Sequence, residues 1–281
     1  MGVIVNTSTE KSLSSSNNNV LTIKTVQINP FRTLMTALKD ILLETNITFK
    51  SDGIHITNMD KSHTIVVHLF LASENFEFYE CKKEKIIIGV NMFQLFKLIN
   101  SIDNDDTLTI YIENEDYFEG IVSHLSLKFE NGNIKQCKTQ KLRLIEPENE
   151  ELVYPDVTFS SIINLPSTDF QKIIRDLSCI SDKLEIKSVG NELIFKCSGQ
   201  FASAEIHRAE SDGSMGFVVK QDSSKVIQGL FSLKNLTYFI KCTNLCPQIE
   251  LFLENDLPLV VKYDVASLGE IKLCLAPLPT L

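Results

Sequence analysis

A helix followed by a β-hairpin occurs twice in this sequence, and the repeat limits the folds that the chain can adopt. In the first copy, Pro30 to His63, apolar residues from Phe31 to Leu42 recur at spacings of three and four and predict one apolar helical face. Asn29 is placed to cap this helix, with Pro30 at its first position. The apolar period changes to two over residues 47–56, where the turn Ser51-Asp52-Gly53 separates two predicted strands.

The second copy runs from Pro166 to Gly199 and has the same order of elements. Apolar residues from Phe170 to Ile180 give the helical face, and a hairpin follows over residues 184–195. A shorter amphipathic helix is predicted later in each half, at 91–101 and at 232–242, among many short strands. Because helices and strands do not alternate regularly, the pattern predicts an α+β protein with large antiparallel sheets, built from two similar modules.

Shifts in composition divide the chain into four segments. Residues 1–19 are rich in Ser and Asn without periodicity, which predicts a flexible tail. The first module covers residues 20–144 and the second covers 160–281. Between them, residues 145–159 contain two Pro and four Glu and predict an extended interdomain connector. Another polar stretch, 209–224, predicts a mobile loop inside the second module.

Composition and charge exclude several classes of protein. With 43% apolar and 22% charged residues, the chain has the composition of a globular protein. Its apolar runs are too short to cross a bilayer, and its polar start lacks the apolar region of a secretory signal. Seven scattered Cys predict a reducing compartment without a disulfide framework. A net charge of −9 argues against nucleic-acid binding over the whole surface.

The positive charge is concentrated on the four predicted helices. They carry seven basic and four acidic residues, 7 − 4 = +3, so the rest of the chain carries −9 − 3 = −12. Basic residues are common on ordinary solvated helix faces, and this interpretation stays open. The alternative is a surface that contacts DNA phosphates, which position a protein without reading sequence. No base-reading or aromatic single-strand motif accompanies it. The basic residues are Arg32, Lys39, Lys97, Lys172, Arg175, Lys234 and Lys241; the acidic ones are Asp40, Glu44, Asp169 and Asp176.

The sequence contains no constellation that predicts catalysis or a metal site. Cys242 and Cys246 have a metal-like spacing, but no second pair of ligands follows them. The acidic turn at 103–106 is more typical of a solvated turn than of a cation site. No phosphate-binding loop, nucleophile elbow or zinc-protease motif occurs. We therefore expect no enzyme activity, no catalytic residue, no cofactor and no metal. Three histidines remain as candidate metal ligands or catalytic bases, and they lie on or beside predicted strands: His55, His63 and His68.

Five stretches carry a more specific pattern: ALKDI, GIHITNMDKSH, IIIGVNM, LPSTDFQKIIRDLS and DLPLVVKYDVASLGEIKLCLAP. They resemble proliferating cell nuclear antigen, the DNA sliding clamp of eukaryotes and archaea. The similarity runs in one register from Val20 to Pro277. The resemblance implies a ring of two-module chains whose helices line a central hole and face duplex DNA.

The resemblance assigns an inner surface to this ring. It implies non-specific contact with the backbone of double-stranded DNA. Thr33, Asn100 and Cys179 depart from the residues usual in the family, which are Lys, Lys and often His. These departures affect the expected strength of the DNA contact and not its location. The matching basic residues are Arg32, Lys39, Lys97, Lys172, Arg175 and Lys241.

By resemblance, identical chains meet head to tail and close into a homotrimer. The strands expected to pair are Lys135–Arg143 of one chain and Phe201–Arg208 of the next. Lys residues on a strand also protect a free edge from pairing, and without the resemblance this second interpretation would be preferred.

The resemblance also implies a pocket under the connector that receives the hydrophobic plug of a partner peptide. An apolar groove beside an extended segment suits such docking. Cys274 stands where the family usually has Tyr, and Tyr154 is larger than the aliphatic residue often found there, so partner preference is expected to differ. Each groove residue is also explained by core or strand-end packing, and for Met59 or Pro258 taken singly packing is the preferred interpretation. The matching residues are Met59, His63, Thr64, Leu152, Tyr154, Pro258, Ala276 and Pro277.

The residues and the resemblance together predict a DNA sliding clamp, a processivity factor for replication and repair. Its expected partners are DNA polymerase, the clamp loader and other proteins with clamp-binding peptides, and no membrane. Two alternatives stay open: one subunit of a heteromeric clamp, and a protein-binding scaffold that never encircles DNA. We expect a nuclear location for a cellular source, the host nucleus or a cytoplasmic replication site for a viral one, and secretion for neither.

Overall fold

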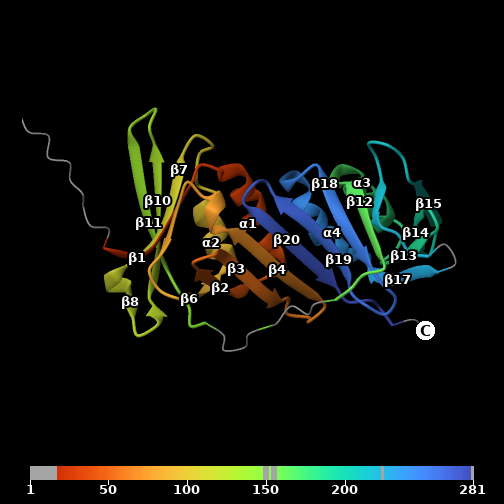
Figure 1. Cartoon of the computed structure of the whole chain (residues 1–281), viewed down its shortest axis with the longest axis horizontal. Coiled ribbons are helices and arrows are strands. Elements are labelled where there is room, and N and C mark those ends of the chain that lie inside the picture. Colours follow the sequence, from red (N-terminus) through yellow and green to blue (C-terminus); the bar gives the residue numbers. More distant parts are fainter. Residues whose placement is uncertain (1–17, 148–151, 153–156, 223–224, 280–281) are drawn as a thin grey trace, which may run out of the picture.

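A computed structural model describes residues 18–147, 152, 157–222 and 225–279. Almost all of the predicted tail and most of the predicted connector therefore lie outside the described residues. The rest forms two helix-and-sheet modules joined through one continuous sheet (Figure 1). This arrangement confirms the predicted α+β fold. The strand before the connector ends at Arg143 and the strand after it begins at Ser161, while the module boundaries themselves stay a prediction.

The first module has a helix after its first strand and a second helix after its sixth. Its elements, in chain order, are β1 (Asn19–Thr25), α1 (Ile28–Ile41), β2 (Glu44–Lys50), β3 (Gly53–Met59), β4 (Ile65–Ala72), η1 (Ser73–Asn75), β5 (Phe78–Cys81), β6 (Lys85–Asn91), α2 (Met92–Ile99), β7 (Thr107–Glu113), η2 (Asn114–Asp116), β8 (Tyr117–Phe118), β9 (Ile121–Val122), β10 (His124–Asn131) and β11 (Gln136–Arg143).

The second module repeats this order in a shorter form. Its elements are β12 (Ser161–Pro166), α3 (Ser167–Ser178), β13 (Lys183–Val189), β14 (Glu192–Ser198), β15 (Ser203–Ala209), β16 (Gly216–Val219), β17 (Val226–Ser232), α4 (Leu233–Phe239), η3 (Ile240–Leu245), β18 (Gln248–Leu253), β19 (Leu259–Val265) and β20 (Gly269–Leu275).

The described strands form three large sheets. The first module holds a five-stranded sheet in the order β11-β10-β7-β1-β5, and the second holds a four-stranded sheet in the order β15-β14-β13-β17. A nine-stranded sheet, β16-β12-β18-β19-β20-β4-β3-β2-β6, contains strands of both. In Figure 1 this sheet crosses the middle of the molecule, and the two smaller sheets stand at its opposite ends.

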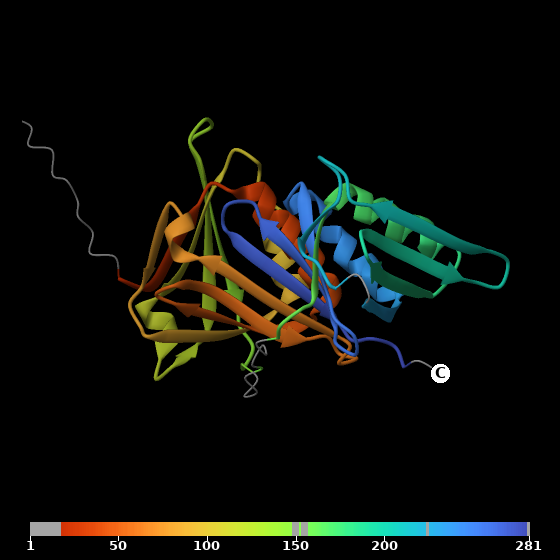
Figure 2. The ribbon, with the colours of Figure 1, turned by 45° about the vertical axis from the view of Figure 1, so that its right-hand side comes forward.

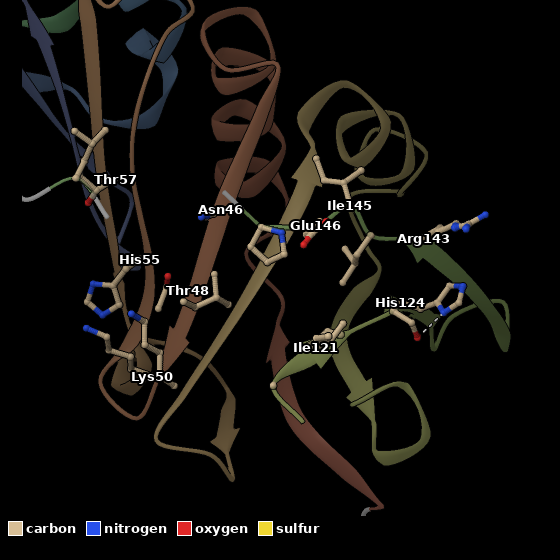
Figure 3. Close-up of a pocket in the computed structure, with 18 residues that line it drawn as sticks. Asn46, Thr48, Lys50, His55, Thr57, Ile121, His124, Arg143, Ile145 and Glu146 are labelled. Atoms are coloured by element: carbon tan, nitrogen blue, oxygen red, sulfur yellow. Dashed lines mark hydrogen bonds between the residues drawn. The ribbon is translucent and has the colours of Figure 1, made fainter. Parts of the chain in front are cut away.

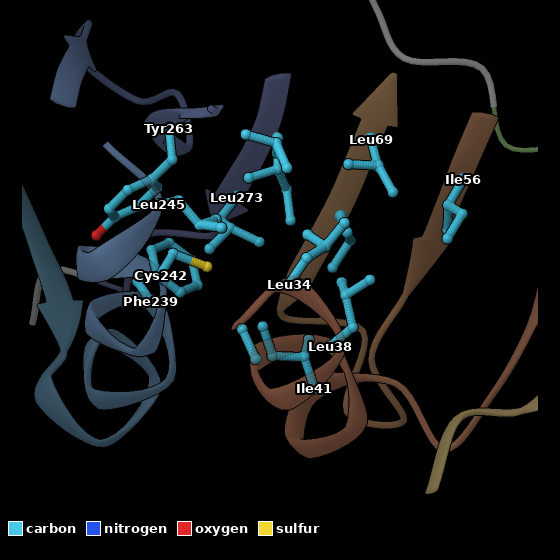
Figure 4. Packing of buried hydrophobic residues seen from close by; sticks show 14 of the residues in the cluster. Leu34, Leu38, Ile41, Ile56, Leu69, Phe239, Cys242, Leu245, Tyr263 and Leu273 are labelled. Carbon is cyan, nitrogen blue, oxygen red and sulfur yellow. The ribbon is translucent and has the colours of Figure 1, made fainter. Parts of the chain in front are cut away.

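The two modules share one core at the seam where β20 pairs antiparallel with β4. Leu34 and Leu38 of α1 are fully buried there, as are Leu69 of β4 and Leu273 of β20 (Figure 4). These residues belong to one hydrophobic cluster that continues through both modules. Because α1 covers strands from both halves of the chain, separating the modules would expose apolar surface on each.

The helices form one row. α2 packs beside α1, α1 packs beside α4 and η3, and α3 packs beside α4 and η3. In Figure 2, α1 and α4 lie behind the strands of the nine-stranded sheet. The row therefore runs from α2 to α3, with α1, α4 and η3 between them.

Two boundaries of the first helix differ from the sequence prediction. α1 begins at Ile28 after Gln27, and Asn29 is not its N-cap. Burial of Ile28 favours the earlier start, and the Thr25 hydroxyl accepts a hydrogen bond from the Gln27 backbone N–H at 3.0 Å. Pro30 is still tolerated because backbone N–H groups of the first turn have no partner inside the helix. Glu44, counted with this helix from the sequence, belongs to β2.

The polar stretch 209–224, predicted to be a mobile loop, contains the strand β16. β16 pairs with β12 at one end of the nine-stranded sheet, and Phe217 lies opposite Ile163. Just before this strand, the Met215 side chain is buried. Pairing with β12 and the burial of one Met outweigh the Gly- and Ser-rich composition that favoured a loop.

The connector begins in contact with β6. The Ile145 backbone N–H donates to the Gly89 carbonyl oxygen at 3.0 Å, and the two residues form an isolated β-bridge. A Cβ on Gly89 would lie 2.7 Å from the Ile145 carbonyl oxygen. Gly89 therefore permits a close approach of two backbones that a larger residue would prevent.

Candidate functional site

α3 carries two of the six predicted DNA-contacting residues. Lys172 and Arg175 are three positions apart, share one face of the helix, and are exposed. Neither side chain forms an ion pair within the described residues. The apolar face of α3, with Phe170, Ile174 and Leu177 buried, fixes this orientation.

α2 carries Lys97, which is also exposed. Its Nζ lies 4.5 Å from the centroid of the Phe93 ring, a cation–π contact. Phe93 is 47% exposed and stacks on Phe96 with ring centroids 6.5 Å apart. This aromatic pair was not expected from the sequence, where both residues fit an apolar helix. Only the exposure of Phe93 beside a lysine distinguishes it from a core residue.

The basic residues in the middle of the row are paired with an acidic residue. Lys39 Nζ lies 2.9 Å from Asp40 Oδ1, and Lys241 of η3 forms an ion pair with the other carboxylate oxygen. Partial burial acts to raise the pKa of Asp40, but hydrogen bonds and charge from the two lysines outweigh it and hold that pKa below its ordinary value. Asp40 therefore stays ionised, and the three residues together carry a charge of +1.

Arg32 is also engaged by the protein itself. Its guanidinium donates to Asn104 Oδ1 at 2.8 Å and to the Ile102 carbonyl oxygen. The side chain thus ties α1 to the loop between α2 and β7. Of the six predicted residues, Arg32, Lys39 and Lys241 have partners of their own, whereas Lys97, Lys172 and Arg175 form no ion pair in the described part of the chain.

The two strands predicted to join neighbouring chains are both sheet edges. β11 is the last strand of the five-stranded sheet and β15 the last of the four-stranded sheet. They stand at opposite ends of the molecule (Figure 1). On β11, Lys141 is held by Glu113 at 3.0 Å and Asp116 at 2.7 Å, and these carboxylates raise its pKa. The predicted strand start Lys135 lies just outside β11, with a positive φ of 53°.

Each edge strand is tied to the nearest end of the helix row. On one side, Lys138 Nζ of β11 donates to Ser101 Oγ, just after α2, at 3.1 Å. On the other, Arg208 of β15 forms an ion pair with Asp169 of α3. These contacts fix α2 beside one free edge and α3 beside the other.

The predicted partner groove is partly assembled. Thr64 lies at its centre, where its carbonyl oxygen accepts from the Ala276 N–H at 3.0 Å. Its hydroxyl accepts from Asn235 Nδ2 at 3.2 Å. His63 occupies the turn before it with a φ of 55°, and Met59 ends β3. The structure therefore brings residues 59–64 together with the end of β20.

The remaining groove residues lie at or near strand ends, apart from one that the structure does not describe. Pro258 is exposed just before β19, and Pro277 is half-buried just after β20. Cys274 is buried opposite Val66 and Val260 on the neighbouring strands. Tyr154 lies outside the described residues.

Leu152 lines a cavity of ≈ 1350 Å³ in the first module. Of the predicted groove residues that the structure describes, no other lines that cavity. Figure 3 shows Thr48, Lys50 and His55 on one side of it and Ile121, His124 and Ile145 on the other. The shared position of Leu152, Met59 and Pro258 in one groove stays a prediction.

The other residues considered from the sequence serve the fold. Cys242 is buried, which raises its pKa to about 12, and burial raises the pKa of Cys246 to about 11, so both thiols stay protonated. In the acidic turn, Asp106 accepts a hydrogen bond from the Asp103 backbone N–H at 3.1 Å. Across the described residues, no group of three or more His, Cys, Asp or Glu is arranged to hold a metal ion. No described helix is long and apolar enough to span a membrane.

Comparison with known proteins finds two family models that match consecutive parts of the chain. The N-terminal domain of proliferating cell nuclear antigen matches residues 20–151, and the C-terminal domain matches residues 153–278. A "Probable DNA polymerase sliding clamp 1" of Paramecium bursaria Chlorella virus 1 is 32% identical over 261 residues, 91% of this chain and 96% of that protein. A "Probable DNA polymerase sliding clamp" of Acanthamoeba polyphaga mimivirus is 34% identical over 226 residues, 80% of this chain and 47% of that protein.

Proposed function

This chain belongs to the proliferating cell nuclear antigen family, and on that basis we propose that it is a DNA sliding clamp, a ring that encircles duplex DNA and tethers a DNA polymerase. The role needs no catalytic group. It requires a surface that closes on itself, a cationic interior that does not read sequence, and a docking site on the outside.

One observation carries this proposal: in the described residues, the edge strands β11 and β15 stand at opposite ends of the molecule, with a row of helices that together carry net positive charge between them. An edge at each end permits a head-to-tail contact, in which β11 of one chain pairs with β15 of the next. Such a heterologous contact forms a ring when the rotation between copies closes. We propose a homotrimer, because the family resemblance gives three copies of a two-module chain.

The inner surface would hold DNA weakly and without sequence preference. Lys and Arg neutralise phosphates and release counterions, so binding weakens as salt rises. Exposed helix residues such as Lys172 and Arg175 suit this task because they carry no base-reading geometry. A ring then slides, because no contact depends on one position along the duplex.

The outer groove would receive a hydrophobic plug from the polymerase, the clamp loader or another replication protein. The hydrogen bond between Ala276 and Thr64, and the pairing of Met59 at the end of β3 with Val66 of β4, support a groove at the seam of the two modules. After β20, the Leu278 N–H donates to the Leu230 carbonyl oxygen at 2.7 Å, which holds this residue against the body. A plug here would rest on strands that are already paired with one another, which lowers the entropy lost on binding.

Polymerase extension on a primed single-stranded circle tests the proposal. With the cognate polymerase and clamp loader, the purified chain alone should increase the length of product per binding event. A requirement for a second clamp-like chain would favour a heteromeric clamp. Peptide binding without any stimulation of synthesis would favour a scaffold that does not encircle DNA.

A further inference from the structure

The six predicted DNA-contacting residues fall into two groups by position in the helix row. Lys39, Lys241 and Arg32 lie on α1 and η3 in the middle of the row, and each has an acceptor within the chain. Lys97 on α2 and the pair Lys172 and Arg175 on α3 lie at the two ends. They are exposed and form no ion pair among the described residues.

The ends of the row are also the ends of the protomer. α2 is tied to β11 through Ser101 and Lys138, and α3 is tied to β15 through Asp169 and Arg208. When β11 of one copy pairs with β15 of the next, paired strands approach to about 4.8 Å. The α2 helix of the first copy then becomes the neighbour of α3 in the second.

We infer that the main phosphate-binding site of the ring is composite, formed at each joint by Lys97 of one copy and by Lys172 and Arg175 of the next. The inference rests on the proposed clamp function. Its ligand is the phosphate backbone of duplex DNA. Each protomer carries one half of the site at each of its ends, and a complete site forms only where two copies meet. DNA contact and ring closure are therefore coupled.

Asp40 makes the middle of each protomer a weaker site. It holds both Lys39 and Lys241, and a phosphate would have to replace a carboxylate already paired with them. The joint carries Lys97, Lys172 and Arg175 against Asp176, a sum of +2 with no internal ion pair in the described chain. The centre, with Arg32, Lys39 and Lys241 against Asp40, also carries +2, but each of these cations already has a partner within the chain. The contrast concerns the availability of the cations more than their number.

Lys234 does not change this assignment. It is exposed at the start of α4, next to Asn235. Because Asn235 donates to Thr64, this end of α4 lies at the partner groove and not at a joint.

Two variants that remove equal charge provide the test. The joint variant is Lys97→Ala/Arg175→Ala and the centre variant is Lys39→Ala/Lys241→Ala, so each loses two positive charges per chain. The measurement is binding of the purified ring to a fluorescein-labelled DNA duplex by anisotropy, over a series of KCl concentrations. Each lost phosphate contact lowers the slope of log affinity against log salt by about one.

The joint variant loses 2 × 3 = 6 cations per ring, so we expect its slope to fall by up to about six units and its affinity by at least about tenfold. We expect the centre variant to lose less than about half as much slope. In an Asp40→Asn background, the same two central substitutions should become as harmful as the joint pair, because the lysines are then released. A centre variant that loses as much as the joint variant in the native background would overturn the inference.

Two controls keep this inference separate from the proposed function. Light scattering must give the same mass for every variant. If Lys97→Ala prevents assembly, the pair Lys172→Ala/Arg175→Ala on α3 replaces it, with the same expected loss. If the unmodified ring binds no duplex and stimulates no polymerase, the clamp proposal itself fails. If the unmodified ring works and all cations contribute equally, only the composite site fails.

Discussion

Glu254 holds Ser160, the residue that follows the connector, against the body of the second module. Its carboxylate accepts hydrogen bonds from the Ser160 backbone N–H at 2.9 Å and from Lys225 Nζ at 3.1 Å. Partial burial acts to raise the pKa of Glu254, but the bonds from Ser160 and Lys225 outweigh it and lower that pKa from 4.5 to about 2. The folded state therefore favours the ionised carboxylate.

The lowered pKa makes the free energy of unfolding depend on pH with a known sign. The stability that ionised Glu254 contributes is fully present above its unfolded pKa near 4.5 and is lost as pH falls toward about 2. We expect Glu254→Gln to reduce the free energy of unfolding by roughly 1–3 kcal/mol at pH 7. The difference between the two proteins should shrink by about half or more at pH 3, measured by urea unfolding.

Glu44→Gln is the matched control, because Glu44 is exposed at the start of β2 and forms no ion pair within the described residues. It should leave the unfolding free energy almost unchanged at both pH values. A loss in Glu254→Gln that is the same at pH 7 and pH 3 would contradict the role of its charge.

A second prediction at the residue scale concerns Gly89. A Cβ there would lie 2.7 Å from the Ile145 carbonyl oxygen and 2.9 Å from that of Glu146, both backbone atoms. Gly89→Ala should therefore displace the start of the connector, break its hydrogen bond to β6 and cost about 1–2 kcal/mol of stability. Thermal unfolding and hydrogen exchange at the Ile145 amide would measure both effects.

Gly132→Ala is the control for this substitution. No atom lies within 4 Å of a Cβ built at Gly132, so the change should be neutral or slightly stabilising. Equal melting temperatures for the two alanine variants would show that the contact between Gly89 and Ile145 does not matter.

At the scale of elements, local periodicity predicted the helices and hairpins but not their long-range partners. The spacing of Phe31, Leu34 and Leu38 is sufficient for α1, because one helical face is encoded within a few turns. The antiparallel pairing of β4 with β20 leaves no local pattern in the sequence. β16 was missed for a related reason, since its stability comes from pairing with β12 and not from its polar composition.

The same division between local pattern and long-range contact holds for the candidate site. Sequence resemblance placed the basic residues on helices, but which of them are engaged depends on partners far along the chain. Lys241 meets Asp40 across 201 positions, and Arg32 meets Asn104 across 72. Composition also gave no sign of the exposed Phe93, because an aromatic residue on an amphipathic helix is usually part of the core.

The prediction at the scale of elements concerns the affinity of the connector for a partner peptide. Leu152 and Tyr154 are apolar residues in an acidic run, and apolar groups in such a segment mark a docking site or packing against the body. Replacing both with Ala should weaken a clamp-binding peptide by at least about tenfold, or 1.4 kcal/mol. The mass of the assembly and its melting temperature should barely change. Calorimetric titration with a peptide from a replication partner measures the affinity.

Val218→Ala serves as the control, because Val218 is 58% exposed on β16, outside the predicted groove. It should bind the peptide as the unmodified protein does. Unchanged affinity in the double variant of the connector would mean that the partner site has been assigned to the wrong surface.

At the scale of the whole molecule, the acidic chain must present a cationic interior. Lys39→Glu/Arg175→Glu reverses the charge of one central and one joint residue, so the charge that faces the DNA changes by four per chain. We expect loss of retention on circular DNA and of polymerase stimulation, with the assembly intact, because phosphates would face carboxylates. Filter retention of clamp on nicked circular DNA, with mass measured in parallel, would detect this. Full stimulation by the variant would mean that other residues line the hole.

The central claim is that the chain closes on itself through β11 and β15, and the mass of the purified particle tests it most directly. One chain has a mass of 31.7 kDa, so a homotrimer has 3 × 31.7 = 95.1 kDa. Multi-angle light scattering at micromolar concentration should give about 95 kDa over a range of dilutions. A stable particle near the mass of one chain, or assembly only in the presence of a different clamp subunit, would contradict the account.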